Sequence, residues 1–229
     1  MSRPSCTRIY QAARMRKSVF FGSLSLTLCL AGSVGYLAAE TREETAASYL
    51  DLGDKFARHG DFNRAIGAYN IALQFAPDFA PAYFNRGLAY EARGEFSKAI
   101  ADYTSALDIV PGLTMAFYNR GNLRFREGNM DGALADFDQA LENDPLYVMA
   151  YNNRGITKAS IGDVDGAMAD FNEAIRINSR HPEAYVNRGL LRLQQGRKVE
   201  AERDFARSIA LRPSLRAFID SRISQISQR

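Results

Sequence analysis

The chain has 229 residues, of which 46% are apolar and 24% are charged, a composition typical of a globular protein and not of a disordered one. Its formal charge is +3, but residues 1–39 carry five basic side chains and no acid, and the remainder has 24 Lys and Arg against 26 Asp and Glu. The main body therefore has no basic surplus, and no nucleic-acid partner is predicted. Both cysteines, Cys6 and Cys29, lie within residues 1–39, which excludes disulfides and thiolate metal sites from the rest.

Residues 1–39 are predicted to be a signal peptide or an N-terminal membrane anchor. A basic start is followed by a stretch without any charge, Val19–Ala39, and this order is typical of a secretory segment. Its densest apolar part, 19–30, has the length of a signal peptide, whereas the whole stretch is just long enough to span a bilayer. The sequence leaves open whether the segment is cleaved.

Everything after Glu40 is accordingly expected outside the cytoplasm, in the periplasm or anchored to the inner membrane, because positive charge before the apolar stretch stays on the cytoplasmic side. A membrane contact is predicted only through the N-terminal segment. Lipidation of Cys29 is disfavoured, since Leu28 stands where the lipoprotein signal needs a small residue. An organelle transit peptide is the alternative, and the long uncharged run argues against it.

From residue 46 the chain repeats itself with a constant period. The segments AYFNRG, AFYNRG, AYNNRG and AYVNRG begin at Ala82, Ala116, Ala150 and Ala184, and a weaker copy, SYLDLG, begins at Ser48. A second segment recurs as AIGAYNIAL, AIADYTSAL, ALADFDQAL, AMADFNEAI and AERDFARSI. This period and pattern resemble the tetratricopeptide repeat, a helix–turn–helix unit. The resemblance covers five units without insertion: 46–79, 80–113, 114–147, 148–181 and 182–215.

The spacing within a unit, counted from position 1 to position 34, agrees with two packed helices. An aromatic residue at position 4 and a glycine at position 8 share one helix face, where glycine lets a second helix approach. A glycine at position 15 suits the turn that ends the first helix. The second helix carries a small, an aromatic and a small residue at positions 20, 24 and 27, which forms an apolar stripe. No unit can bury this stripe alone, so stability must come from stacking neighbours.

These features predict an all-α fold, a right-handed helical solenoid in which residues 40–229 form five repeats plus a C-terminal capping helix over 214–227. Thr41–Glu44 reads as a capping box that begins the first helix directly after the N-terminal segment. Ser214 is predicted to cap the last helix. The side of that helix expected to cover the fifth repeat carries Leu215, Phe218, Ile219, Ile223 and Ile226.

Arg at position 7 and Asp at position 23 are predicted to form an ion pair between the two helices of one repeat. The first repeat supports this interpretation, because it has Leu52 and Ala68 at these positions, so that both partners are missing together. The predicted pairs are Arg86–Asp102, Arg120–Asp136, Arg154–Asp170 and Arg188–Asp204.

The sequence does not indicate an enzyme. His59 and His181 fall in turns and are expected to be solvated, and no phosphate loop, zinc motif or nucleophile elbow is present. Acids that recur at one repeat position indicate architecture and not a single active site. No catalytic residue, no metal site and no cofactor is predicted.

The resemblance implies a binding groove lined by the first helices, with position 6 facing it. Amides there could grip an extended peptide backbone, with Phe84 and Tyr118 among the apolar neighbours. The alternative is that the amides bond within the stack and that the aromatic rings belong to the core between repeats. The predicted groove residues are Asn85, Asn119, Asn153, Asn187, Phe84 and Tyr118.

The resemblance also implies what such a groove would bind. Some modules of this family capture a C-terminal carboxylate with Lys and Arg, but the corresponding first-helix positions here carry no cation, which argues against that mode. The predicted partner is therefore a protein or an extended peptide, and the predicted function is that of an exported adaptor or scaffold, by analogy one that assembles envelope complexes. The alternatives are a self-associating structural module, which makes a homo-oligomer possible, or an accessory subunit of a cell-wall or polysaccharide enzyme.

Overall fold

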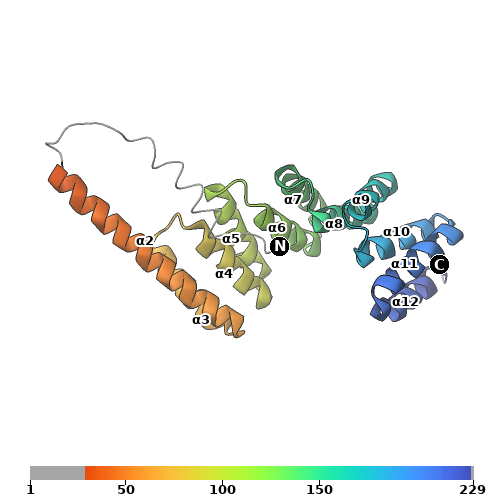
Figure 1. Cartoon of the computed structure of the whole chain (residues 1–229), viewed down its shortest axis with the longest axis horizontal. Coiled ribbons are helices and arrows are strands. Elements are labelled where there is room, and N and C mark those ends of the chain that lie inside the picture. The colour runs from red at the N-terminus through yellow and green to blue at the C-terminus, as the bar shows by residue number, and fades with distance from the viewer. Residues whose placement is uncertain (1–28, 228–229) are drawn as a thin grey trace. The chain divides into compact units, whose positions relative to one another are not determined.

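The computed structural model describes the backbone of residues 29–227, with side chains from Thr41 onward. The chain divides into two compact units between Ala116 and Phe117. The first unit holds α2 (Cys29–Arg58), α3 (Phe62–Phe75), α4 (Ala80–Ala92) and α5 (Phe96–Ile109) (Figure 1). The second holds most of α6 (Thr114–Arg126), and then α7 (Met130–Asn143), α8 (Val148–Ser160), α9 (Val164–Ile177), α10 (Pro182–Gln194), α11 (Lys198–Leu211), a 3-10 turn (Pro213–Leu215) and α12 (Arg216–Ser227). The described residues form helices and no strand, so the predicted all-α solenoid class with an added C-terminal helix is confirmed.

Each predicted repeat forms two helices joined by a tight turn. The glycine at position 15 has a positive φ, between 76° and 86°, in all five turns, which confirms its predicted role there. The second helices of three repeats begin at an N-cap whose side chain accepts a hydrogen bond from a backbone N–H of the first turn. These caps are Asp61 of α3, Asn129 of α7 and Asp163 of α9.

The glycine at position 8 is the point of closest approach between the two helices of a repeat. A Cβ atom built on Gly87 would lie 2.7 Å from Cε1 of Tyr103, and one on Gly189 would lie 2.6 Å from Cε1 of Phe205. The ring at position 24 thus lies directly on the glycine backbone, as the spacing predicts. These rings are at most 5% exposed and, with the flanking alanines, they form the core of each repeat: Tyr69, Tyr103, Phe137, Phe171 and Phe205.

Position 27 of the fifth repeat departs from this pattern. Ser208 stands where the other four repeats have alanine, and its side chain is fully buried with no hydrogen-bond partner for the hydroxyl. Since a buried hydroxyl without a partner is destabilising, we expect Ser208→Ala to raise the free energy of unfolding by about 1 kcal/mol. Urea denaturation at neutral pH measures this change. A loss of stability would show instead that the hydroxyl is satisfied in solution.

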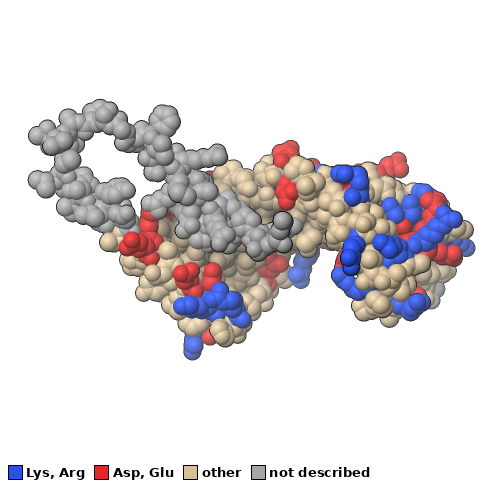
Figure 2. Space-filling model, viewed as in Figure 1, with Lys and Arg blue, Asp and Glu red and all other residues tan. Residues whose placement is uncertain are grey.

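Charge is unevenly distributed along the described chain. Residues 180–227 carry ten basic and five acidic side chains, and Figure 2 shows Lys and Arg gathered over the C-terminal helices. The basic residues are Arg180, Arg188, Arg192, Arg197, Lys198, Arg203, Arg207, Arg212, Arg216 and Arg222, and the acidic ones are Glu183, Glu200, Glu202, Asp204 and Asp220. The C-terminal end of the second unit is therefore positive in a main body that is otherwise acidic.

All four predicted ion pairs between positions 7 and 23 are present. The closest N–O distances are 2.7 Å for Arg86–Asp102, 2.7 Å for Arg120–Asp136, 2.6 Å for Arg154–Asp170 and 2.7 Å for Arg188–Asp204. In each pair Nε and Nη2 donate to the two carboxylate oxygens, which is the strong bidentate arrangement. The aspartates are 2–5% exposed, so the pairs are structural parts of the interior.

The arginine at position 7 also joins each of three repeats to the one before it, which the sequence analysis did not predict. In each case its Nη1 donates to a side-chain oxygen of the preceding repeat. The distances are 2.6 Å for Arg86–Asn70, 2.6 Å for Arg154–Asp138 and 2.7 Å for Arg188–Asn172. Its guanidinium lies over the aromatic ring at position 4 of its own repeat, 5.4–5.6 Å from the centroid. One side chain therefore ties together both helices of a repeat and the preceding second helix.

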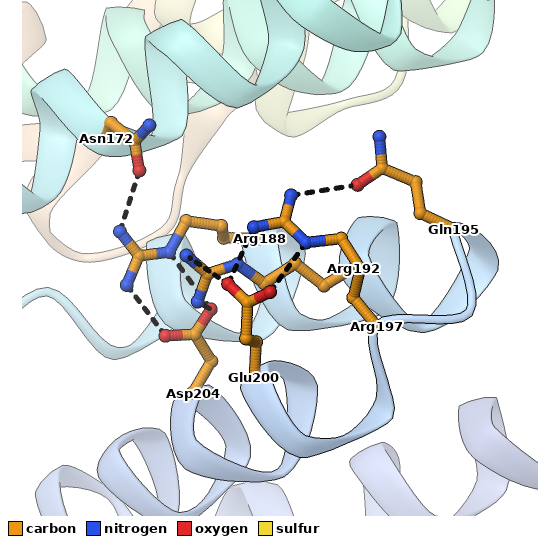
Figure 3. Close-up of polar contacts among 7 residues, drawn as sticks. All are labelled: Asn172, Arg188, Arg192, Gln195, Arg197, Glu200 and Asp204. Carbon is orange, nitrogen blue, oxygen red and sulfur yellow. Dashed lines mark hydrogen bonds and ion pairs between the residues drawn. The ribbon is translucent and has the colours of Figure 1, made fainter.

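A second cation at position 11 contacts the aspartate in the last three repeats. The distances are 2.9 Å for Arg124–Asp136, 2.9 Å for Lys158–Asp170 and 2.7 Å for Arg192–Asp204. Figure 3 shows the fifth-repeat cluster, in which Arg188 and Arg192 converge on Asp204, and Arg192 also approaches Glu200 at 3.6 Å. Position 11 of the second repeat is Tyr90, so in the described structure Asp102 has Arg86 as its ion-pair partner and no second cation from this position.

The two predicted helix starts at the ends of the array are wrong. α2 begins at Cys29, so Thr41 lies inside a continuous helix, where its carbonyl accepts a hydrogen bond from Oγ1 of Thr45. A capping box cannot form there, because the backbone N–H groups are already within the helix. Ser214 lies in the 3-10 turn that precedes α12 and does not directly begin it.

The C-terminal helix covers the fifth repeat with only part of the face predicted for it. Ile219 is 1% exposed, and Leu215 and Ile223 pack against the same cluster, which includes Val186 and Phe205. Phe218, placed by the sequence analysis on the covering side, is instead 52% exposed. Consecutive residues differ by about 100° around a helix, so Phe218 and Ile219 cannot both face the core centre.

The predicted signal peptide or anchor lies largely outside the described residues, which include only the helical backbone of 29–39 from that segment. Within the described part of the chain, no helix combines the length and the apolar character needed to cross a bilayer.

Candidate functional site: the groove of the second unit

Two adjoining cavities open between α8, α10 and α12. The larger, of about 310 Å³, is lined by Asn152, Ile156, Glu183, Val186, Asn187, Leu215 and Phe218. The smaller, of about 270 Å³, is lined by residues that include Ile156, Ser160, Asn187, Leu190, Gln194 and Arg222. Because Ile156 and Asn187 line both cavities, the two form one continuous surface, called here the groove.

The repeat geometry explains why these residues meet. α8 and α10 are the first helices of the fourth and fifth repeats, and they contact each other across the stack. Residues at positions 5, 6 and 9 of each first helix therefore face the same side. α12 follows the last repeat and contacts α10, so it takes the place that the first helix of a sixth repeat would occupy.

The larger cavity is mainly apolar. Phe218 is 52% exposed, and Val186, Leu215 and Ile156 lie around it. Met149, at position 2 of α8, adds another exposed apolar side chain on the same helix, with 47% of its surface accessible. An apolar surface of this kind gains free energy when a ligand removes it from water.

The predicted asparagines lie at equivalent places, and three of them already donate hydrogen bonds to the preceding repeat. Nδ2 of Asn153 donates to Tyr118 at 3.1 Å and to Asn122 at 2.7 Å, so both of its N–H groups have partners. Nδ2 of Asn187 donates to Oδ1 of Asn152 at 2.8 Å. Asn119 is half-buried at the same position of α6.

In the first compact unit, Asn85 also donates a hydrogen bond to the preceding repeat. Its Nδ2 donates to Oδ1 of Asp54 at 2.8 Å, and the hydroxyl of Tyr69 donates to the same oxygen at 2.7 Å. The amide donors thus stabilise the stack, which is the structural alternative that the sequence left open. What remains available to a ligand is chiefly the carbonyl oxygens, of which Oδ1 of Asn153 already accepts one hydrogen bond from Nδ2 of Asn152 at 3.0 Å.

Phe84 and Tyr118 are core residues in the structure. Phe84 is 5% exposed and its ring lies 5.7 Å from that of Tyr103. Tyr118 is 8% exposed and lies 6.1 Å from the ring of Phe137 and 5.0 Å from that of Tyr147. Little of either ring is left for a ligand, and the exposed aromatic side chain of the groove is Phe218.

Phe218 and Arg222 were not predicted as groove residues, because the sequence of residues 214–227 indicates only a helix that covers the fifth repeat. One signal was present: Phe218 and Ile219 are adjacent, so one of them had to lie at the margin of the buried face. Arg222 also changes the earlier conclusion about charge. The first helices supply no cation at the positions considered, but α12 brings one to the smaller cavity.

His181 caps the first turn of α10 beside the groove. Its Nδ1 accepts a hydrogen bond from the backbone N–H of Ala184 at 3.2 Å, and the ring is half-buried, contrary to the expectation of a solvated turn. Burial lowers the pKa of His181 below its ordinary value, although Glu183, 3.5 Å away, partly opposes the shift. An accepting Nδ1 carries no proton, so the folded state favours the neutral ring.

We expect His181 to make the protein less stable below about pH 6.5. Between that value and the lower pKa of His181 in the folded protein, the unfolded chain binds more protons than the folded protein. Stability therefore falls as the pH falls. His181→Asn keeps a capping oxygen that does not titrate, and should flatten this part of the profile. Urea denaturation across the range measures it, with His59→Asn, in an exposed turn, as the control. Equal profiles for wild type and His181→Asn would contradict the assignment.

Comparison with known proteins agrees with the repeat architecture. A family model described as tetratricopeptide repeat matches residues 50–113, 118–182 and 162–215. No curated protein matches the sequence. Among solved structures, a crystal structure of MamA is 25% identical and has a TM-score of 0.67, with 71% of this chain and 95% of that chain covered. A second MamA structure is 26% identical, with a TM-score of 0.68 and coverages of 76% and 96%.

Two further structures share the fold at lower identity. YrrB, described as a tetratricopeptide repeat protein with an unusual peptide-binding site, is 22% identical, with a TM-score of 0.65 and coverages of 78% of this chain and 92% of that chain. PilF of Pseudomonas aeruginosa is 20% identical, with a TM-score of 0.65 and coverages of 81% and 90%. The matched segments span most of residues 50–215, and this chain therefore belongs to the tetratricopeptide repeat family.

Proposed function

We propose that this protein is a scaffold that binds an extended segment of another protein in the groove of the second unit. The observation that carries the proposal is the pair of adjoining cavities between α8, α10 and α12, with Phe218 exposed in the larger one. Tetratricopeptide repeat proteins bind proteins and peptides, and YrrB is described as having a peptide-binding site.

The groove is preorganised for such a ligand. The groove helices α8 and α10 are held to their partner helices by the bidentate pairs Arg154–Asp170 and Arg188–Asp204. A rigid groove loses little conformational entropy on binding, so more of the apolar contact energy contributes to affinity. The amide oxygens at position 6 can accept hydrogen bonds from the N–H groups of an extended backbone.

The binding site can be tested with random peptides displayed on phage and selected against the full chain. Enriched peptides are then synthesised, labelled and titrated by fluorescence anisotropy. Phe218→Asp should weaken binding at least about tenfold, because it places a charge in the apolar cavity. Val199→Asp is the matched control, since Val199 is 62% exposed on α11 and lines neither cavity. Peptides that bind Phe218→Asp as well as wild type, or no enriched peptides, would overturn the proposal.

We further propose that the repeats act outside the cytoplasm, in the assembly of envelope complexes. The support is the sequence of residues 1–39, whose basic start and uncharged stretch Val19–Ala39 are typical of export. Alkaline phosphatase fused after residue 229 should be active with the full chain and inactive when residues 1–39 are removed. N-terminal sequencing of the mature protein distinguishes cleavage near residues 33–39 from a retained anchor. Activity that does not require residues 1–39 would contradict export.

A further inference from the structure

We infer that α12 gives the groove a preference for acidic apolar segments, with Arg222 binding a carboxylate of the ligand next to the cavity that receives an apolar side chain. The inference rests on the proposed peptide-binding function and adds the chemistry of the partner. It also makes the C-terminal helix a binding element in addition to a cover for the last repeat.

Arg222 is the cation of the groove. It lines the smaller cavity, and its Nη1 donates to the amide oxygen of Gln225 at 2.9 Å. Among the described residues, no carboxylate lies within ion-pair distance of Arg222, in contrast to Arg188 and Arg192 of α10, which both bind Asp204. Arg222 therefore presents a positive charge that the described residues leave uncompensated, together with donors suited to bidentate carboxylate binding.

Glu183 is the acidic residue that lines the groove. It lines the larger cavity, but Nη1 of Arg212 donates to its Oε1. Its negative charge is therefore already compensated. Of the two charged residues that line the groove, only Arg222 has no opposite charge bound to it in the described structure, so the groove is net positive.

Basic side chains outnumber acidic ones in the C-terminal part of the second unit. Residues 180–227 hold twice as many basic as acidic side chains, and Figure 2 shows Lys and Arg gathered over the C-terminal helices. A surplus of one sign around a binding site raises the local concentration and the association rate of ligands of the opposite sign. Neutral and basic segments gain nothing from this field.

Asn187 lies between the cavity that Arg222 lines and the apolar cavity that Phe218 lines. Asn187 lines both cavities, and its Nδ2 is engaged by Asn152, which leaves its carbonyl oxygen as an acceptor at the junction. An extended segment that donates a backbone N–H to this oxygen can direct one side chain toward Phe218 and another toward Arg222. The matching ligand has a large apolar residue close to an Asp or Glu.

The test is a comparison of peptides selected from the displayed library by three forms of the full chain. Wild type should enrich sequences with an acidic residue near an apolar one, and Arg222→Glu should lose that enrichment. Arg216→Glu is the control, because Arg216 is exposed on the same helix and lines neither cavity. An acidic peptide selected by wild type should bind Arg222→Glu about tenfold more weakly, and its Lys-for-Glu analogue should bind Arg222→Glu more tightly than it binds wild type.

The outcomes separate the two proposals. Enriched peptides that depend on Phe218 but show no acidic preference, or an equal loss of affinity in Arg216→Glu and Arg222→Glu, would overturn the role of Arg222 and leave the groove intact as the binding site. The absence of peptides that depend on Phe218 would overturn the groove itself. Loss of acidic enrichment in Arg222→Glu alone supports the inference.

Discussion

Replacing Arg86 by leucine should lower the free energy of unfolding by about 3–5 kcal/mol, the range for removing one partner of a buried ion pair. Asp102 is 5% exposed, and both of its oxygens accept hydrogen bonds from Arg86. Position 11 of this repeat is Tyr90 and supplies no cation, so the substitution leaves a buried carboxylate without its ion-pair partner. Hydrogen bonding to Asp102 raises the pKa of Arg86, so the guanidinium stays charged at neutral pH.

The first repeat supplies the compensating change. It has Leu52 and Ala68 at positions 7 and 23, where Leu52 is 39% exposed and Ala68 is 4% exposed, so neither position carries a charge in this repeat. Arg86→Leu combined with Asp102→Ala should therefore recover most of the lost stability, because no charge is left buried. Urea denaturation of the two single variants and the double variant forms a complete double-mutant cycle.

The third repeat provides a matched comparison for the same substitution. Arg120→Leu should be less destabilising than Arg86→Leu, because Arg124 remains 2.9 Å from Asp136. Equal losses at the two sites would show that the destabilisation comes from packing and not from an unpaired charge. A double variant no more stable than Arg86→Leu would rule out the coupling between Arg86 and Asp102.

The second large effect is expected from Gly53→Ala, which should lower the free energy of unfolding by about 1–3 kcal/mol. A Cβ on Gly53 would lie 2.6 Å from Cδ1 and 2.9 Å from Cζ of Tyr69. The ring cannot move away easily, since it is 1% exposed and its hydroxyl donates to Asp54 at 2.7 Å. The methyl group must therefore separate α2 from α3 or displace a buried aromatic ring.

Gly67→Ala in the same repeat is the control, and it should have the opposite sign. Gly67 lies in the interior of α3, is exposed, and a Cβ there would meet no atom within 4 Å. Alanine has a higher helix propensity than glycine, so stability should rise by about 0.5–1 kcal/mol. Thermal denaturation of the two variants compares them directly. A neutral Gly53→Ala would show that the two helices are not in close contact in solution.

The parts of the fold that could be predicted are those that repeat. Five copies of one pattern show which positions vary together, and the joint loss of Arg and Asp at Leu52 and Ala68 was enough to predict a contact between helices. The glycine at position 8 and the ring at position 24 followed from helix geometry in the same way. Each of these predictions concerns contacts inside one repeat, which every copy must make.

The groove could be predicted only in part, because its key residues lie outside the repeat. α12 occurs once, so no second copy shows which of its side chains face Ile156 and Asn187. Asn153 is ambiguous for another reason: an amide at position 6 can bond to a ligand or to the preceding helix, and the choice depends on the distance between repeats. The second cation, such as Arg124, was overlooked because position 11 is basic in only three repeats.

Hydrogen–deuterium exchange of the full chain, with and without an acidic peptide selected by wild type, tests the central claim most directly. If the peptide binds in the groove, protection should increase in α8, α10 and α12, and above all in α12, whose exposed end exchanges readily without ligand. The outward helices α9 and α11 should change little. Protection confined to α9 and α11, or binding that leaves α12 unprotected, would contradict the assignment of the groove as the binding site.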